Sequence, residues 1–225
     1  MTKKVAVVLS GCGCFDGAEI HESVLTLLAL SKNGADYEVI APNKDQYHVI
    51  NHATGKEMPE KRNILVEAAR IARGEIKDLA RANPEDYDAL IFPGGFGAAK
   101  NLFDFALKQD ESYEVDPDVI AFIKAFKQAQ KPVGFICIAP MMIPLVYPSD
   151  VKMTIGNEQS VAKIVQAKGA QHINTAVDAI CIDEKNKVVS TSAYMLGQNP
   201  YEVSQGIEKL VNKVLEMSKS SVHSL

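Results

Sequence analysis

An apolar, strand-like run in this sequence ends on a cysteine at a place that suits a nucleophile. The stretch is KPVGFICIAPMMIP (131–144); its strand-like part stops at Cys137, and a helix-like pattern follows directly. A sharp strand-to-helix turn holds its side chain toward the amides that open the helix. Those amides lower the pKa of a thiol, and the thiolate is the reactive form. A buried core cysteine explains the same pattern, so this stretch alone leaves both interpretations open.

A glycine-rich loop and an acidic helix start supply partners for such a cysteine. The loop FPGGFGAAKN follows a strand-like run, and its glycines let backbone amides approach a ligand closely. The amides of Gly95 and Ile138 would together form an oxyanion hole. In GAEIHES, Glu19 and Glu22 lie about one helical turn apart, so a carboxyl could carry protons beside the thiol. The alternative is an exposed acid that favours the helix dipole, which suits Glu19 better than Glu22.

Other residues with reactive side chains give weaker patterns. His21, between the two acids, is as consistent with a surface residue as with a functional one. Cys12 and Cys14 form a C-x-C pair without further ligands at metal spacing, so we expect no metal. The segment GGFGAA lacks the dinucleotide spacing, so we expect no cofactor. Cys181 lies in a β-rich run and is predicted to be a core residue.

The three chemical loops need a scaffold that brings them together, and the pattern of elements predicts one. Short apolar runs predict strands at 4–10, 36–42, 88–95, 131–137 and 188–194. Helices are expected at roughly 60–73, 98–107, 117–129, 158–168 and 200–217, after a first helix with an apolar stripe of Ile20, Val24, Leu27 and Leu28 that stops at Gly34. This alternation predicts a mostly parallel sheet, whose carboxyl edge gathers the loops. The segment AICIDEKNKVVSTSA predicts an antiparallel hairpin at the sheet edge.

Length and charge exclude several classes of protein. The chain has 225 residues, 47% of them hydrophobic, and a formal net charge of −4, which favours neither nucleic acid nor an anionic membrane as a partner. We find no export signal or membrane span, and four cysteines give no disulfide framework, so we expect a cytoplasmic protein. One domain, 1–225, is predicted, with an insertion at about 43–60 and a frayed tail at about 218–225.

Taken in order, LSGCGCFDGAEIHESVLTLLAL, FPGGFGAAKN, GFICIAP and TIGN resemble one known group of sequences. They resemble the ThiJ/PfpI branch of the class I glutamine amidotransferase-like superfamily, and within it the ElbB family, also called enhancing lycopene biosynthesis or sigma cross-reacting protein. The resemblance implies a flavodoxin-like three-layer α/β sandwich. It implies that Cys137 is a nucleophile on an elbow, that Glu22 hydrogen-bonds the thiol, and that Gly95 and Ile138 supply oxyanion-hole amides.

The resemblance also implies a function, with one departure. Some members of the superfamily are described as cofactor-free glyoxalases that act on small dicarbonyls, and dimers are common, so we expect a glyoxalase-like lyase and a homodimer. Many relatives carry a histidine where this sequence has Gly156, which argues against a glutaminase and predicts slow turnover. A cysteine-based redox sensor and an accessory protein of isoprenoid biosynthesis are the alternatives. Further residues expected near the pocket are Cys12, His21, Gly94, Asn101 and Gly156.

Overall fold

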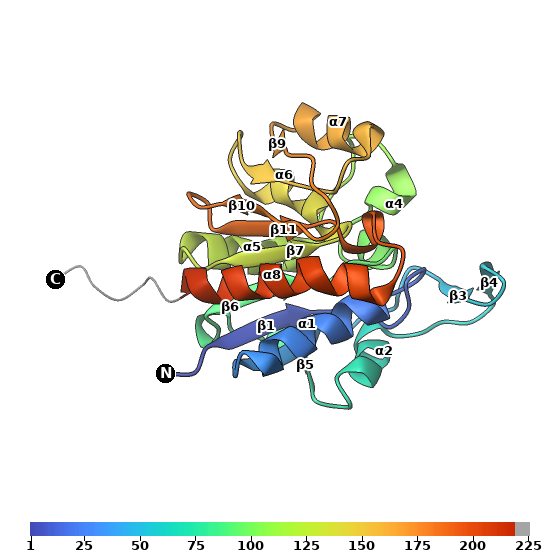
Figure 1. The fold of residues 1–225 in the computed structure, drawn as a ribbon. Coiled ribbons are helices and arrows are strands. Elements are labelled where there is room, and N and C mark those ends of the chain that lie inside the picture. The colour runs from blue at the N-terminus through green and yellow to red at the C-terminus, as the bar shows by residue number, and fades with distance from the viewer. Residues whose placement is uncertain (219–225) are drawn as a thin grey trace.

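A seven-stranded sheet runs through the centre of the molecule and carries helices on both faces (Figure 1). The computed structural model describes residues 1–218. The strand order is β10-β11-β7-β6-β1-β2-β5, and every neighbouring pair is parallel except β10 and β11. The strands are β1 (Lys4–Val8), β2 (Asp36–Ala41), β5 (Ile76–Asp78), β6 (Ala89–Phe92), β7 (Val133–Ile136), β10 (Cys181–Asp183) and β11 (Val188–Thr191). The three-layer α/β fold and the antiparallel edge hairpin are therefore confirmed.

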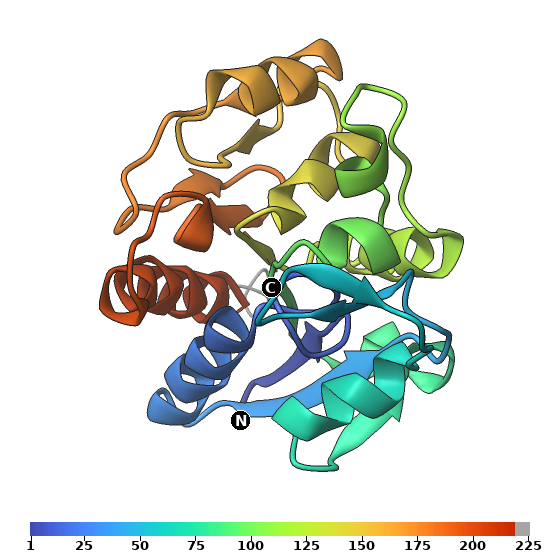
Figure 2. The ribbon, with the colours of Figure 1, turned by 90° about the vertical axis from the view of Figure 1, so that its right-hand side faces the viewer.

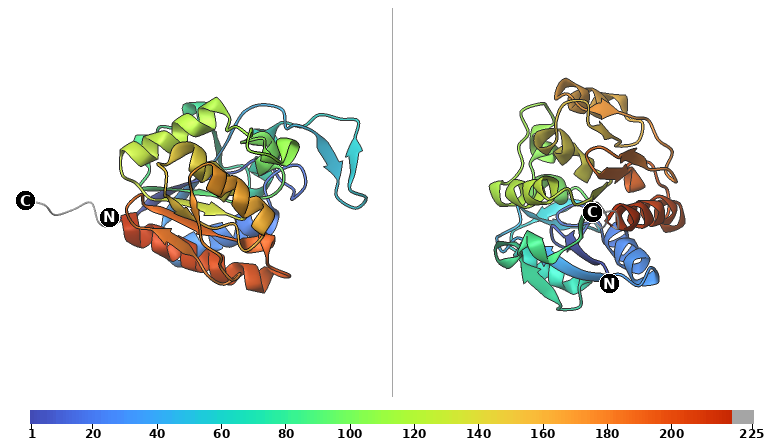
Figure 3. Two further views of the ribbon diagram at one scale, coloured as in Figure 1. Left: turned by 90° about the horizontal axis from the view of Figure 1, so that it is seen from above. Right: turned by 90° about the vertical axis from the view of Figure 1, so that its left-hand side faces the viewer.

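The long helices form the outer layers. They are α1 (Ile20–Lys32), α2 (Ile64–Ile71), α5 (Pro117–Gln128), α7 (Gln159–Ala167) and α8 (Pro200–Ser218). Seen along the sheet, α1 and α8 lie together on one face and α5 lies on the other (Figures 2 and 3). Helix α8 ends at Ser218, and the rest of the predicted frayed tail at 218–225 lies outside the described residues.

Short helical turns fill several connections between the strands. They are α3 (Ala98–Asn101), α4 (Phe105–Lys108), α6 (Ile143–Val146) and the 3-10 turns η1 (Leu79–Arg81), η2 (Pro84–Asp86), η3 (Ala139–Met142) and η4 (Ala193–Met195). The prediction of a single helix at 98–107 is wrong, because the helix is interrupted between α3 and α4. There Phe103 forms a β-bridge with Val115, and the N–H of Asp104 donates to the carbonyl of Glu114, 3.1 Å away.

The apolar runs of the sequence form the centre of the sheet. Every residue of β6, β7 and β11 is buried, as expected for strands that are covered on both faces. The runs are longer than the strands because their last residues belong to turns at the carboxyl edge. This edge is where Gly94, Cys137 and Tyr194 lie, each within three residues of the end of its strand.

The insertion at 43–60 forms a β-hairpin of its own. Its strands are β3 (Val49–Asn51) and β4 (Lys56–Met58), joined by the turn predicted at NHATGK. The hairpin projects at the carboxyl edge of the sheet, on the side away from the N-terminus (Figures 1 and 3). A second small sheet, of β8 (Lys152–Met153) and β9 (Gln171–His172), was not predicted, because two-residue strands leave no periodic pattern.

Helix α1 leaves most of its apolar stripe exposed, and of the four residues only Leu27 packs partly against the core. Ile20, Val24 and Leu28 are 41%, 48% and 59% exposed, although an apolar stripe ordinarily faces the core. The buried side of the helix carries Glu22, Ser23, Thr26, Ala29 and Leu30. The two hydroxyls on that side each donate to a carbonyl one turn earlier, 2.7 Å away, so their burial leaves no unpaired donor. The helix is therefore oriented to bring a carboxyl, rather than its apolar stripe, to the sheet edge.

Candidate active site at the Cys137 turn

Cys137 forms the tight turn between β7 and the 3-10 helix η3. Its φ is 64°, in the left-handed region that costs a non-glycine residue about 1–3 kcal/mol. Its N–H donates to the carbonyl of Thr191 on the neighbouring strand β11, at 2.9 Å, which ties the turn to the sheet. The side chain is buried. The sharp turn expected at this residue is present, although four residues of 3-10 helix follow it instead of an α-helix.

The Glu22 carboxyl, in the first turn of α1, contacts the Cys137 thiol. Its Oε1 accepts from the N–H of Gly94 at 2.8 Å, its Oε2 accepts from the N–H of Tyr194 at 3.4 Å, and a side-chain hydrogen bond joins it to the thiol. Burial, followed by the charge of Glu19, raises the pKa of Glu22 to about 8. A carboxyl with a pKa near neutrality can both accept and return a proton.

Two backbone amides complete the surroundings of the sulfur. The N–H groups of Gly95 and Ile138 both donate to Cys137. Gly95 has a φ of 102°, and a β-carbon there would lie 2.6 Å from the backbone nitrogen of Glu19. Only glycine therefore fits this position, where the loop after β6 meets the start of α1. Four of the residues that the sequence singled out thus lie together: Glu22, Gly95, Cys137 and Ile138.

The electrostatics of the thiol differ from the sequence prediction. Burial, and then the negative charge of Glu22, raises the pKa of Cys137 well above its usual value, while the amides of Gly95 and Ile138 oppose that rise. The prediction of a thiol activated by a helix start is wrong, because η3 is too short and the group is desolvated. The thiol therefore keeps its proton until a neighbouring base takes it, and Glu22 is in contact with it.

The other residues expected near the pocket have different positions. Gly94 borders both the thiol and Glu22. Asn101 is buried and holds backbone segments together, since its amide donates to the carbonyls of Ser10 and Asp16 and its oxygen accepts from the N–H of Tyr47. It therefore stabilises the loops rather than contacting the thiol.

Cys12 lies close to charged residues of helix α2. Burial, and then the charge of Glu67, raises its pKa, with smaller effects of Arg70 and Asp16. We therefore place this cysteine beside the site and not in it.

A histidine at position 156, where the resemblance places one, would be crowded and would strain the backbone. Gly156 has a φ of 105°, and a β-carbon on it would lie 3.0 Å from Cγ of Leu196 and 3.2 Å from Cβ of Ser192. His172, the next histidine along the chain, accepts the N–H of Ile155 at 3.1 Å and so serves the backbone. A histidine at position 156 would therefore require Leu196 to shift.

One pair beside the site was missed by sequence reasoning. His21 Nδ1 lies 2.6 Å from the hydroxyl of Tyr194, although 173 residues separate them. The only local signal was the position of Tyr194 at the end of a predicted parallel strand.

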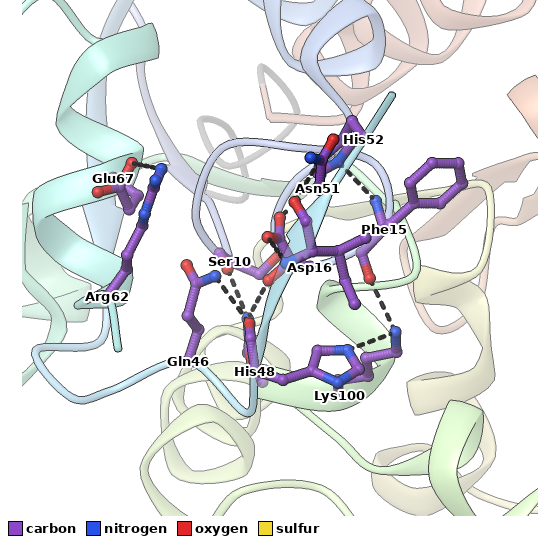
Figure 4. A network of polar contacts seen from close by, with 12 residues as sticks. Ser10, Phe15, Asp16, Gln46, His48, Asn51, His52, Arg62, Glu67 and Lys100 are labelled. Atoms are coloured by element: carbon purple, nitrogen blue, oxygen red, sulfur yellow. Dashed lines mark hydrogen bonds and ion pairs between the residues drawn. The ribbon is translucent and has the colours of Figure 1, made fainter. Parts of the chain in front are cut away.

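The hairpin of the insertion is bonded to the first loop of the site (Figure 4). Asp16 accepts the N–H of Ile50 at 2.8 Å, and His52 accepts the N–H of Phe15 at 3.2 Å and stacks on its ring. Lys100 donates to the carbonyl of Phe15 and to a ring nitrogen of a hairpin histidine, His48. These contacts hold the loop of residues 11–17 against the glycine loop that supplies Gly95.

A hollow lies next to the turn. Its volume is about 400 Å³, and Ile138, which follows the nucleophile, is part of its wall. The remaining wall is mostly apolar: Phe96, Lys100, Phe105, Ala106, Gln109, Ser160, Val161 and Ile164. A larger hollow of about 990 Å³ lies at the β2–β5 edge beside α2; Cys137 and Glu22 line neither hollow, and only the smaller one includes a residue next to the nucleophile. Within residues 1–218, no three His, Cys, Asp or Glu side chains converge as metal ligands, and no helix has the length and apolar character to cross a membrane.

The buried thiol, its carboxyl and the fold define a class of protein. The sequence pattern of the DJ-1/PfpI family matches residues 3–198, so the chain belongs to that family. The predicted membership of the ThiJ/PfpI, class I glutamine amidotransferase-like superfamily is confirmed at this level.

Individual relatives carry several different names. The chain is 44% identical over 225 residues to glutamine amidotransferase-like class 1 domain-containing protein 3, mitochondrial, of Homo sapiens, covering 96% of this chain and 83% of that protein. It is similar in structure to the isoprenoid biosynthesis protein with amidotransferase-like domain from Ehrlichia chaffeensis, with a TM-score of 0.90 and 34% identity over 97% of this chain and 100% of that one. Glyoxalase III from Candida albicans shares the fold, with a TM-score of 0.63 and 14% identity over 96% of this chain and 97% of that one.

Proposed function

We propose that this protein is a cofactor-independent, glyoxalase-like enzyme that converts glyoxal or methylglyoxal into a 2-hydroxy acid. One observation carries the proposal: a thiol, a carboxyl with a pKa of about 8 and two amide donors meet at Cys137. A nucleophile, a proton carrier and oxyanion donors are the groups that an internal redox reaction of a 2-oxoaldehyde needs. None of the steps calls for a metal or a hydride carrier.

The reaction would begin with addition of the sulfur to the aldehyde. Glu22, in its ionised form, takes the thiol proton and passes it to the aldehyde oxygen as Cys137 attacks carbon C1, which gives a hemithioacetal. The amides of Gly95 and Ile138 hold that oxygen while charge develops on it. Glu22 then moves the C1 hydrogen, as a proton, to C2 through an enediol, and a thioester results. Hydrolysis of the thioester releases glycolate or lactate and restores the thiol.

The raised pKa of Cys137 favours this function over a redox sensor. Oxidation of a cysteine by peroxide follows its thiolate content and exposure, and this thiol is buried with its pKa raised. An enzyme, in contrast, needs the thiolate only while the substrate is bound, and Glu22 can remove the proton at that moment. The name of the Ehrlichia protein supports a role in isoprenoid biosynthesis, and membership of the ElbB family is part of the same proposal.

Partners and compartment belong to the proposal as well. We expect a small dicarbonyl substrate, a homodimer, and no nucleic acid or membrane partner. A cytoplasmic location stays a prediction. The alternative is a mitochondrial location, because the human relative is named as a mitochondrial protein.

The proposed function is tested by measuring lactate formed from methylglyoxal. The variants are Cys137→Ala and Glu22→Gln, with Cys181→Ala as the matched control, since Cys181 is a buried cysteine on β10. We expect lactate formation to vanish in Cys137→Ala, to fall at least about a hundredfold in Glu22→Gln, and to persist in Cys181→Ala. Loss of the aldehyde without lactate in the wild type, or lactate from Cys137→Ala, would contradict the proposal.

A further inference from the structure

A tyrosine and a histidine from opposite ends of the chain form a hydrogen-bonded pair at the site. Tyr194 lies in the turn η4 after β11, and His21 is the second residue of α1. The 2.6 Å between Nδ1 and the phenol oxygen is short for a nitrogen–oxygen hydrogen bond, and the two rings are tilted with centroids 5.7 Å apart. A proton can therefore pass directly between the two side chains.

The backbone ties this pair to the buried carboxyl. The N–H of Tyr194 donates to Glu22 Oε2 at 3.4 Å, and His21 precedes Glu22 in the chain. The surroundings of the site also affect the Tyr194 phenol. Its pKa is raised by burial and then by the charges of Glu19 and Glu22. A phenol with a raised pKa keeps its proton at neutral pH and can donate it.

The turn that carries Tyr194 repeats the strain of the turn that carries the nucleophile. Ala193 has a φ of 42° and Cys137 a φ of 64°, and both follow neighbouring parallel strands, β11 and β7. Left-handed backbone at a non-glycine residue is costly and is retained where the surrounding structure enforces it, often at functional sites. The strain at Ala193 turns the chain so that Tyr194 lies over α1.

The turn that carries Tyr194 also packs against Gly156, the position at which many relatives carry a histidine. Leu196, two residues after Tyr194, is the nearest neighbour of a β-carbon at Gly156. Cys137 and Glu22 are buried, whereas Tyr194 is half-buried and His21 is exposed. The pair is thus more accessible to solvent than the reacting groups, and it supplies an imidazole next to Glu22 in the chain, whereas position 156 supplies none.

We propose that Tyr194 and His21 act together as the second acid–base group of the Cys137 site, moving a proton between the two oxygens of the bound substrate. This inference rests on the proposed function. As Glu22 takes the C1 hydrogen, the C–H electron pair becomes the C1=C2 bond and the C2=O π pair moves to the C2 oxygen. That oxygen takes the phenol proton of Tyr194, His21 Nδ1–H replaces it, and the other ring nitrogen of the exposed His21, Nε2, takes a proton from water that it gives back in the return step.

The return step restores the pair. Glu22 delivers its proton to C2, and the C1 hydroxyl becomes the thioester carbonyl. The proton leaving the C1 oxygen goes back to Tyr194 and His21, so no external oxidant, reductant or net proton is required. Glu22 thereby moves hydrogen from carbon to carbon, and the pair moves a proton from oxygen to oxygen.

The test compares Tyr194→Phe, His21→Gln and the double variant with wild type in lactate formation from methylglyoxal. Tyr201→Phe is the matched control, because Tyr201 is an exposed tyrosine of α8. We expect kcat to fall about a hundredfold in Tyr194→Phe with little change in KM, and the double variant to be no slower than Tyr194→Phe, because the two groups act as a unit. Alkylation of Cys137 by iodoacetamide should keep its wild-type rate in each variant.

Three results separate the possibilities. A kcat of Tyr194→Phe within about twofold of wild type overturns the role of the pair. A lower kcat that is matched by an equal change in Cys137 alkylation also overturns it, because the pair would then only support the shape of the site. Wild-type protein that makes no lactate overturns the proposed function itself, which the wild-type arm alone reveals.

Discussion

Gly94 and Cys137 are so close that no side chain fits between them. A β-carbon on Gly94 would lie 2.5 Å from Cβ of Cys137 and 2.9 Å from Oε1 of Glu22. Real β-carbon contacts are not this short, so the thiol and the carboxyl can meet only because residue 94 is glycine. The glycine loop thus determines the distance between nucleophile and proton carrier, in addition to supplying an amide.

Replacing Gly94 by alanine should separate the thiol from its carboxyl. We expect Gly94→Ala to lose about 1–3 kcal/mol of unfolding free energy, as overpacked cores do, and to form lactate at least about tenfold more slowly. Urea unfolding and the lactate assay measure the two effects. Gly55→Ala is the control without crowding, since open space surrounds its β-carbon, and its φ of 74° adds backbone strain that Gly94 does not have. Wild-type activity in Gly94→Ala would show that the site tolerates the extra methyl group.

The raised pKa of Glu22 should make the stability of the protein depend on pH. The folded state holds this proton with a pKa of about 8, above the ordinary 4.5, so it binds more protons than the unfolded state between those values. Unfolding free energy should therefore fall as pH rises from 5 to 8, by at most on the order of 5 kcal/mol from this group.

The variant Glu22→Gln isolates that contribution. It carries no ionisable group at position 22, so its unfolding free energy should change less between pH 5 and 8. Glu75→Gln, at an exposed acid, should follow the wild type. Urea titrations at several pH values give the slopes, and equal slopes for wild type and Glu22→Gln would refute the raised pKa.

The orientation of α1 predicts unequal losses of stability for two leucines two residues apart. Leu30 is fully buried and Leu28 is 59% exposed. We expect Leu30→Ala to lose about 2–5 kcal/mol of unfolding free energy and Leu28→Ala less than about 1 kcal/mol. Urea unfolding measures both. An equal loss at Leu28 would mean that this side chain is covered in solution, which the predicted homodimer could do.

The same helix shows why sequence reasoning found the fold but not every contact. Continuous apolar runs predicted β6, β7 and β11 because strands buried on both faces have no other pattern. Cys137 and Gly95 were predictable because both follow such runs and the carboxyl ends of parallel strands meet. The face of α1 was not, since its burial is decided by Glu22 and its bonds rather than by hydrophobicity. Nor was the contact between His21 and Tyr194, which depends on a strained turn at Ala193 that no local pattern marks.

The hollow beside Ile138 should favour 2-oxoaldehydes with an apolar substituent. The hollow has a volume of about 400 Å³, and most of the side chains that line it are aromatic or aliphatic. Ile138, the residue after the nucleophile, is one of them, so a substituent on C2 has apolar surface to contact. Burying a phenyl group instead of a methyl group is worth roughly tenfold or more in kcat/KM. We therefore expect phenylglyoxal to be a better substrate than methylglyoxal.

A substitution in the wall separates this preference from the chemistry of the thiol. Val161→Trp should fill part of the hollow and lower kcat/KM for phenylglyoxal about tenfold, while the value for methylglyoxal changes less than about twofold. Val66→Trp, at an exposed valine of α2 outside the hollow, should leave both values unchanged. Equal losses for the two substrates in Val161→Trp would place the substituent elsewhere. A wild-type preference for methylglyoxal would mean that the hollow does not take part in substrate binding.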